Sequence, residues 1–362
     1  MSRFLLISKG YPPETGGLES YAKQVGAAYA AEGHEVVLLT ACSATRKEFE
    51  DDNVRILNVG MAPQLIVFLR MLQVLFRFSP GDFDIVHATT WRTAMPALVR
   101  GFRASIVLTV HGREVFVVPS YLKRLMSLTF RRVDAVIGIS APIMVKFQET
   151  IHPKLRQVGV AWDGISFQRL AEAHSPAPNP SQIFCVCRLV ERKNLHGAIM
   201  ALAPLKREGL DFRFFIAGLG PERERLAGLI HQLDLKSHVT LLGRISDEDL
   251  LGYYRSSGIF LHPQIATLDG GDIEGFGISI ADAMSFGAAV IAGNSGGPSD
   301  FISHGSTGLL VDGQQPEAIT TAVRNLLMRP EEQRQLGLAA QAFALRELTW
   351  SRHVERIMAL VS

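Results

Sequence analysis

The chain has 362 residues and a formal net charge of +2, from 37 Lys and Arg against 35 Asp and Glu. This length predicts two domains of ordinary size, and the nearly balanced charge argues against nucleic acid as the main partner. Apolar residues make up 47% and charged residues 20% of the chain, a composition typical of an α/β protein with a hydrophobic core.

Short apolar runs alternate with helical patterns through the first half of the chain. The expected strands are Phe4–Ser8, Glu35–Thr40, Val54–Val59, Asp84–Ala88, Ser105–Val110 and Ala135–Ile139. The expected helices are Leu18–Glu32, Leu65–Phe78 and Tyr121–Arg132. This alternation predicts βαβ units and a mostly parallel sheet, and the nearly continuous apolar strands indicate a sheet that is covered on both faces.

The segment 171–180 (AEAHSPAPNP) is the clearest break in composition, and we predict a linker at 173–180. The alternation of strands and helices then restarts. The expected strands are Ile183–Cys187, Phe212–Ala217, Val239–Leu242, Ile259–His262, Ala289–Ala292 and Gly308–Val311. The sequence therefore predicts an α/β protein with two Rossmann-like domains, 1–172 and 181–348, that face each other across a cleft. In such open sheets, ligands bind at the carboxyl ends of the strands.

Neither of two apolar stretches in the first domain predicts a secretory signal or a helix that crosses a membrane. The run Phe4–Ser8 is too short for a secretory signal, and the longest apolar stretch, 65–78, contains Arg70, Gln73 and Arg77. The cysteines Cys42, Cys185 and Cys187 form no CxxC pair and are expected to be buried free thiols. We therefore expect a cytoplasmic protein.

A glycine-rich stretch in the second half, Glu274–Gly277 (EGFG), directly precedes a predicted helix. Glycines let the backbone come close to a ligand, and the first amides of a helix are unpaired donors at the positive end of its dipole. The amides of Phe276, Gly277 and Ile278 are therefore predicted to form a seat for a phosphate.

Charged side chains lie on both sides of this predicted seat. Glu274 precedes it and Asp282 lies one turn into the helix, so the two carboxylates can bind hydroxyl groups on either side of a diphosphate, as a nucleotide-sugar requires. Arg188 and Lys193 follow the first strand of the second half. They are predicted to neutralise a diphosphate leaving group, although such residues at a strand exit are otherwise simply solvated.

Two motifs of the first half are expected at the edge of the cleft. His111 follows the predicted strand Ser105–Val110 and is placed to hydrogen-bond a sugar, the alternative being a structural histidine. Gly16 and Gly17 precede the first helix and either approach the diphosphate or form an ordinary turn between strand and helix.

Further turns of the second half also end strands. Gly218-Leu219-Gly220 resembles the start of a dinucleotide fingerprint, but its third glycine is missing and no ribose-binding acid follows. Arg244 follows the next strand and belongs either to a site for the nucleotide base or to an ordinary turn. Gly296-Gly297 either approaches the phosphates or serves turn geometry alone.

Two segments of the first half combine apolar and basic residues. The stretch 65–78 has one narrow polar stripe on an apolar helix. The stretch 122–133 combines apolar residues with four basic ones, Lys123, Arg124, Arg131 and Arg132. Such helices either lie on an anionic bilayer or pack on their own sheet with a solvated basic face. A peripheral contact with the inner face of the membrane stays open on this basis.

With these residues together, the chain resembles the family-4 retaining glycosyltransferases of GT-B fold, over nearly its whole length. The motifs that carry the resemblance are Gly16-Gly17, the strand 84–87, His111-Gly112, Arg188 with Lys193, Gly218–Gly220, the EGFG stretch and 308–311. Two positions depart from the family pattern: Asp282 stands where a second Glu is usual, and Asp163-Gly164 where Asn-Gly is common. Both departures concern the details of donor choice.

The resemblance implies that Arg188 and Lys193 bind the donor diphosphate, and that Glu274 and the helix-start amides hold sugar and phosphate. It further implies that His111 contacts the transferred sugar and that the last helix, 349–362, packs back on the first domain. It implies retention by front-face attack, in which the leaving phosphate takes the proton of the acceptor.

The expected enzyme is a retaining glycosyltransferase that moves a hexose-type sugar from a nucleoside diphosphate sugar to a glycan or lipid-linked acceptor in envelope polysaccharide or glycolipid synthesis. No metal and no further cofactor are expected, because no Asp and Glu cluster with metal-ligand spacing stands out. The alternatives are a nucleotide-sugar hydrolase or epimerase, a nicotinamide oxidoreductase that uses Gly218–Gly220, and a non-catalytic sugar- or lipid-binding relative. The base, the sugar and the acceptor are not determined by these patterns.

Overall fold

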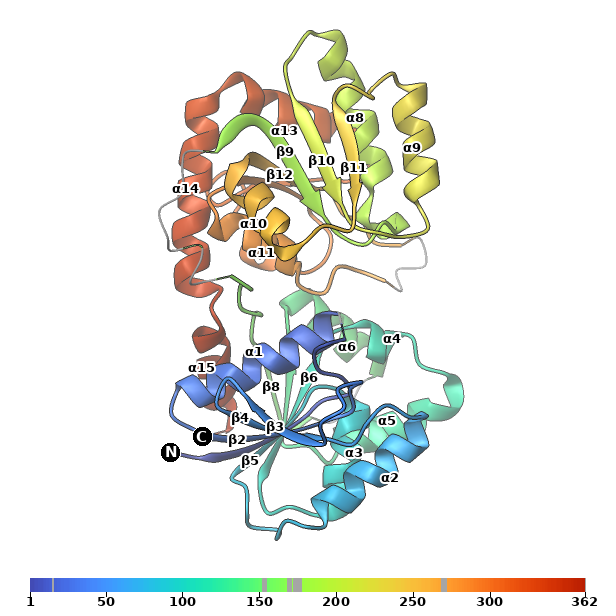
Figure 1. Cartoon of the computed structure of the whole chain (residues 1–362), viewed down its shortest axis with the longest axis vertical. Helices are drawn as coiled ribbons and strands as arrows, with labels where there is room; N and C mark the ends of the chain where they lie inside the picture. Colours follow the sequence, from blue (N-terminus) through green and yellow to red (C-terminus); the bar gives the residue numbers. More distant parts are fainter. Residues whose placement is uncertain (15, 152–154, 168–170, 172–177, 268–271, 362) are drawn as a thin grey trace. The chain divides into compact units, whose positions relative to one another are not determined.

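The computed structural model describes residues 1–14, 16–151, 155–167, 171, 178–267 and 272–361. The chain divides into two units, Met1–Gly164 with Trp350–Ser362, and Ile165–Thr349 (Figure 1). The division falls before the predicted domain end at 172, because the Ile165 amide donates to the carbonyl of Leu348, 2.9 Å away, in the second unit. Most of the predicted linker, 173–177, lies outside the described residues, and strand β9 already begins at Asn179.

The first unit contains an eight-stranded sheet in the order β3-β4-β2-β1-β5-β6-β7-β8. All neighbouring strands pair in parallel except β3 with β4. The strands are β1 Arg3–Ile7, β2 Glu35–Thr40, β3 Glu48–Asp51, β4 Val54–Asn58, β5 Ile85–Ala88, β6 Ser105–Val110, β7 Ala135–Gly138 and β8 Gln157–Val160. The helices are α1 Gly17–Ala31, α2 Gln64–Leu75, α3 Trp91–Arg100, α4 Arg113–Phe116, α5 Ser120–Phe130, α6 Ala141–Ile151 and α15 Trp350–Val361.

The strand order places the helices of this unit on two faces. The chain moves one way along the sheet from β1 to β2 and the opposite way from β4 through β5 and β6 to β7. Since crossovers between parallel strands are right-handed, α1 covers one face and α2, α3 and α5 cover the other. The last helix, α15, packs against α1. Its His353 donates through Nδ1 to the carbonyl of Trp162, 2.9 Å away.

The second unit contains a six-stranded parallel sheet in the order β11-β10-β9-β12-β13-β14. Its strands are β9 Asn179–Val186, β10 Arg213–Ala217, β11 Val239–Gly243, β12 Ser257–His262, β13 Ala289–Gly293 and β14 Leu309–Val311. Its helices are the 3-10 turn η1 Glu191–Lys193, α8 Leu195–Arg207, α9 Arg223–Gln232, α10 Asp247–Ser256, α11 Ile278–Ser285, α12 Pro298–Phe301, α13 Pro316–Met328 and α14 Pro330–Glu347. This is the strand order of a doubly wound dinucleotide-type fold, with its reversal between β9 and β12.

The predicted α/β architecture of two mainly parallel sheets is confirmed. Strands β3 and β8 and helices α3, α4 and α6 of the first unit were not predicted, and the reasons for β3 and α3 differ. Strand β3 (EFED) is an acidic edge strand, and its sequence has no run of apolar residues that would predict a strand. It is held in the sheet by antiparallel pairing with β4. Helix α3 contains Pro96, which breaks the helical pattern, but Thr90 and Thr93 form a capping box at its start. No helix in the described part of the chain is both long enough and apolar enough to cross a membrane.

Candidate functional site

The strand order of the second unit places two loops at one edge of its sheet. Strands β9 and β12 are neighbours at the point where the order reverses. The loop after β9 carries Arg188 and the turn η1, and the loop after β12 leads to Glu274 and α11. Open α/β sheets bind ligands at such a switch point, because the loops on its two sides diverge and leave a crevice.

A buried cluster of charged groups joins these two loops. The Glu274 carboxylate accepts from Arg192 Nη1 at 2.7 Å and also from Lys193 Nζ. Arg192 Nε lies 3.3 Å from a carboxylate oxygen of Asp272. The side chains of Arg192, Lys193 and Glu274 are only 11%, 9% and 10% exposed. These contacts fix Glu274 beside Arg192 and Lys193, which lie 82 and 81 residues earlier in the sequence.

The two cations determine the charge of the buried carboxylate. Burial raises the pKa of Glu274, but the positive charges of Lys193 and Arg192 outweigh burial and hold this pKa well below its usual range. Glu274 is therefore ionised at neutral pH. A buried ion pair costs desolvation energy and is weak evidence for stability alone, so this cluster is better explained by function.

The EGFG stretch ends in the start of a helix. Gly277 precedes α11 with a φ of 97°, a left-handed conformation that glycine adopts without strain. The Phe276 side chain is buried against Phe301, with 4.8 Å between ring centroids. Among the described residues, the amides of Phe276, Gly277 and Ile278 have no hydrogen-bond acceptor. These amides therefore fit the predicted anion seat.

Gly296 and Gly297 pack on the backbone of this stretch. The Gly297 amide donates to the Glu274 carbonyl at 2.8 Å. A Cβ atom on Gly296 would lie 2.4 Å from the Glu274 carbonyl oxygen, and one on Gly297 would lie 2.3 Å from that of Gly275. The two glycines thus serve close approach between two protein segments and hold Glu274 in place.

Substitution Gly296→Ala should lower the free energy of unfolding by about 2–4 kcal/mol. Two costs add: the strain of an alanine at a left-handed φ of 82°, and the overlap of its Cβ with the Glu274 carbonyl oxygen. Urea denaturation measures this change. The matched control is Gly305→Ala, at a φ of 78° with open space around the new Cβ, which should cost only about 1–2 kcal/mol. Equal losses in the two variants would contradict a packing role for Gly296.

Asp282 lies inside the unit and has a partner there. Its carboxylate accepts from the Ser166 amide at 2.6 Å, and the residue is 3% exposed. Burial raises the pKa of Asp282 to about 7, against the lowering effect of the Ser166 hydrogen bonds. The carboxylate that was predicted to bind a donor hydroxyl is therefore engaged by the backbone of the protein.

This pKa predicts how stability depends on pH at Asp282. Because the folded-state pKa is raised, the protonated form is favoured by folding, and this stabilisation is lost as the pH rises from about 4 to about 7. Relative to the unmodified protein, Asp282→Asn should gain on the order of 4 kcal/mol of unfolding free energy between about pH 4 and about pH 8. Urea denaturation across this range measures the gain. Asp211→Asn, at an exposed acid, should give a curve parallel to that of the unmodified protein, and parallel curves for both variants would refute the prediction.

The remaining predicted residues of the second unit lie at the same sheet edge. Arg188 and Arg244 are exposed and follow β9 and β11. Gly218 follows β10, and its Cβ would lie 1.9 Å from the Cys187 carbonyl oxygen. A Cβ on Gly220 would lie 2.2 Å from the Leu189 carbonyl oxygen. These two glycines therefore hold the Arg188 loop rather than form an open dinucleotide fingerprint.

His111, Gly16 and Gly17 belong to the first unit. His111 follows β6, and its ring packs edge-on against Tyr21 at 4.6 Å between centroids. Burial and the charge of His353 lower the pKa of His111 to about 3, so the ring is neutral. Its Nε2 is buried and has no partner among the described residues. Gly16 and Gly17 begin α1, and a Cβ on Gly17 would meet nothing within 4 Å.

Three residues of the charge cluster and its support were not predicted from the sequence. Arg192 and Asp272 complete the ion pairs around Glu274. Asn194 has a left-handed φ of 52°, accepts from the Gly197 amide, and donates to the carbonyls of Pro263 and Gly313. The available signal was the charged run Glu191–Lys193 directly before this cap residue.

One group of side chains in the described part of the chain has the spacing of metal ligands. The ligand atoms of Cys185, Cys187 and His262 lie within 4.8 Å of one another, and thiolates with imidazole are ligands that zinc prefers. The two sulfur atoms are 4.0 Å apart, since alternate residues of a strand share a face. All three cysteines of the chain, including Cys42, are free.

Family models match both halves of the chain. Residues 16–159 match the "Glycosyl transferase 4-like domain", and residues 166–343 match "Glycosyl transferases group 1". In Mycolicibacterium smegmatis, a GDP-mannose-dependent alpha-(1-6)-phosphatidylinositol monomannoside mannosyltransferase is 29% identical, covering 99% of this chain and 98% of that protein. A glycogen synthase of Mycobacterium tuberculosis is 26% identical, over 96% and 91% of the two chains.

Solved structures share the fold. Sucrose-phosphate synthase from Thermosynechococcus elongatus has a TM-score of 0.77 and 22% identity, over 99% and 98% of the two chains. Anabaena HepE, in complex with UDP and glucose, has a TM-score of 0.76 and 16% identity, over 99% of each chain. The fold is therefore the predicted GT-B fold, and the chain belongs to the family of glycosyltransferases described as glycosyl transferases group 1.

Proposed function

We propose that this protein transfers a hexose-type sugar, with retention, from a nucleoside diphosphate sugar to a lipid-linked or glycan acceptor. The observation that carries the proposal is the buried cluster of Lys193, Arg192 and Glu274 beside the unpaired amides at the start of α11. The relatives that act on GDP-mannose or make glycogen support the same class of donor and product. A hydrolase or epimerase reaction is not favoured by these relatives.

In this proposal the donor diphosphate binds at the switch point of the second unit. An ammonium group has three donors, so Lys193 Nζ can contact the leaving phosphate while Glu274 holds it in position. Arg188 adds a second cation, and the amides of Phe276, Gly277 and Ile278 add donors that need no reorganisation. Arg244 is assigned to the nucleotide, and Asp282 supports α11 through Ser166.

The proposed chemical step uses these groups to stabilise the charge that develops on the diphosphate. We assign this stabilisation to Arg188, Lys193 and the helix-start amides, without a catalytic metal ion or another cofactor. The acceptor attacks the same face of the sugar from which the diphosphate leaves, and a phosphate oxygen takes the acceptor's proton. The neutral ring of His111, with its unpartnered Nε2, is assigned as the hydrogen-bond acceptor for a hydroxyl of the transferred sugar.

A panel of UDP-, GDP- and ADP-sugars, with and without a glycolipid acceptor, tests this function. The expected result is acceptor-dependent consumption of one donor, unaffected by EDTA, with the anomeric configuration of the donor kept in the product, as NMR coupling constants report. Thermal shifts with the free diphosphates identify the base, because a ligand that binds the folded state raises its melting temperature. Equal donor consumption without acceptor would identify a hydrolase instead, and an inverted product would refute retention.

We also assign the protein to the cytoplasm, at the periphery of the membrane, since a lipid-linked acceptor presents its sugar there. Flotation of the full chain with anionic vesicles measures this association.

A further inference from the structure

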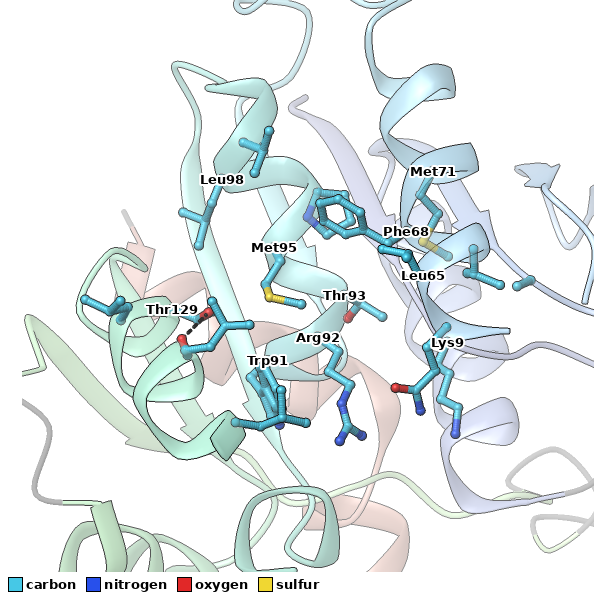
Figure 2. Close-up of a pocket in the computed structure, with 18 of the residues that line it drawn as sticks. Lys9, Leu65, Phe68, Met71, Trp91, Arg92, Thr93, Met95, Leu98 and Thr129 are labelled. Atoms are coloured by element: carbon cyan, nitrogen blue, oxygen red, sulfur yellow. Dashed lines mark hydrogen bonds between the residues drawn. The ribbon is translucent and has the colours of Figure 1, made fainter. Parts of the chain in front are cut away.

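A large apolar cavity lies in the first unit between α2, α3 and α5. Its volume is about 750 Å³, within the range of ligand pockets and far beyond the voids of a close-packed interior. Figure 2 shows Phe68 of α2 and Met95 of α3 projecting into the space between the helices. Three of its lining residues, Leu65, Leu125 and Leu128, are 69%, 43% and 48% exposed. Large apolar side chains that stay uncovered around one cavity indicate a binding site for an apolar group.

The charged residues that line this cavity all have the same sign. Lys9, Arg92 and Arg132 line it, and no acidic residue does. Within the described residues, none of these three cations forms an ion pair. The Arg92 guanidinium lies 4.8 Å from the centre of the Trp91 ring, and Lys9 and Arg92 lie at the same edge of the cavity (Figure 2). The site thus combines an apolar interior with a cationic edge.

The strand order places this cationic edge at the switch point of the first unit. Lys9 follows β1, and Arg92 lies at the start of α3 after β5. Strands β1 and β5 are the neighbours between which the strand order reverses. The carboxyl edge at a switch point is where an open α/β sheet binds its ligand. A polar headgroup at Lys9 and Arg92 would thus lie at the ligand-binding edge, with its apolar part between the helices.

We propose that the cavity binds the hydrocarbon chain of a single anionic lipid, whose phosphate or carboxylate headgroup contacts Lys9 and Arg92. This lipid is the acceptor of the sugar, an assignment that rests on the proposed function. The apolar lining explains why a hydrocarbon chain enters, and Lys9 and Arg92 at one edge, with no acid in the lining, explain why the headgroup is anionic. The exposed leucines of α2 and α5 are then covered by the ligand.

The test uses the full chain and n-dodecyl phosphate below its micellar concentration, followed by titration calorimetry. The expected result is saturable binding of one molecule, with n-dodecyl maltoside and inorganic phosphate each binding at least about tenfold more weakly. Leu65→Gln and Arg92→Gln, at residues that line the cavity, should each weaken binding about fivefold. The matched controls are Leu69→Gln on the same helix as Leu65 and Arg131→Gln on the first unit, both at exposed residues outside the lining, and they should bind as the unmodified protein does.

Each other outcome overturns the assignment. Equal weakening in lining and control variants would show adsorption to a general basic surface, as a bilayer contact gives. Equal affinity for n-dodecyl maltoside and n-dodecyl phosphate would refute the proposed preference for an anionic headgroup. Binding of UDP, GDP and ADP, measured on the same variants, separates this proposal from the proposed function. Sugar transfer to a water-soluble acceptor without dodecyl phosphate binding would refute the lipid site alone, and lipid binding without donor turnover would refute the transferase alone.

Discussion

Replacing Lys193 by alanine is expected to reduce kcat/KM for sugar transfer by roughly 10²–10³-fold, the usual cost of removing one donor that stabilises developing negative charge. Lys193 is 9% exposed and is fixed by Glu274, so no neighbouring cation can move into its place without breaking another contact. Steady-state rates at varied donor concentration measure the effect, which should be larger in kcat than in KM. Arg188→Ala should act in the same direction.

Lys206→Ala is the control for this prediction. Lys206 lies on α8 of the same unit and pairs with Asp234 at 2.7 Å, outside the switch point. Its loss should leave kcat/KM within about twofold, since a surface ion pair contributes little. Near-normal turnover in Lys193→Ala and Arg188→Ala together would count against the assigned donor site.

The second large effect is expected at Glu274. The substitution Glu274→Gln removes the anion and leaves Lys193 and Arg192 buried with an amide between them. Breaking a buried ion pair from one side lowers the free energy of unfolding by about 3–5 kcal/mol, because the remaining charge is uncompensated. Turnover should fall as well, since Lys193 loses its fixed position. Urea denaturation and donor kinetics measure the two effects separately.

The pH dependence of this loss has a defined sign. The positive charges of Lys193 and Arg192 hold the folded-state pKa of Glu274 below its usual range, so its stabilising contribution is present at neutral pH and is lost as the pH falls. The stability difference between Glu274→Gln and the unmodified protein should therefore shrink in acid. A difference that stays constant from neutral pH into acid would mean that Glu274 is not ionised in the folded protein.

A matched variant separates the buried cluster from ordinary ion pairs. Glu208 accepts from Arg324 Nε at 2.7 Å and Nη2 at 2.6 Å near the surface of the same unit, and Glu208→Gln should change stability little. In the double variant Lys193→Met with Glu274→Gln, part of the lost stability should return, since one of the unpaired cations is gone. Strict additivity of the two single changes would refute direct coupling between these residues.

Apolar periodicity and turn chemistry were sufficient to predict the strands of both sheets except β3 and β8. Strands such as Glu35–Thr40 and Ser105–Val110 were predicted with the bounds that the structure gives them. The reason is local: an apolar run of five or six residues between glycine- or charge-rich turns has few alternatives to a buried parallel strand. The start of α11 after EGFG is equally local, since a glycine in the left-handed region ends one conformation and begins the next.

The partners of the site residues depend on the folded sheet. Arg192 meets Glu274 because β9 and β12 are neighbours, an arrangement that strand order alone decides. The same holds for Asp282, whose spacing suited a donor hydroxyl but whose carboxylate binds the Ser166 amide. Gly296 and Gly297 look like turn residues in the sequence, and only the structure shows the backbone that they pack against.

The sequence by itself thus determined the fold class, most strands of the two sheets and the start of α11 after EGFG, because each depends on residues within about one turn or strand of each other. The tertiary structure decided that Arg192 forms an ion pair with Glu274 and that Asp282 accepts a hydrogen bond from the Ser166 amide. It also decided that α2, α3 and α5 enclose an apolar cavity with a cationic edge. These features depend on strand order and helix packing, which bring together residues that no sequence spacing relates.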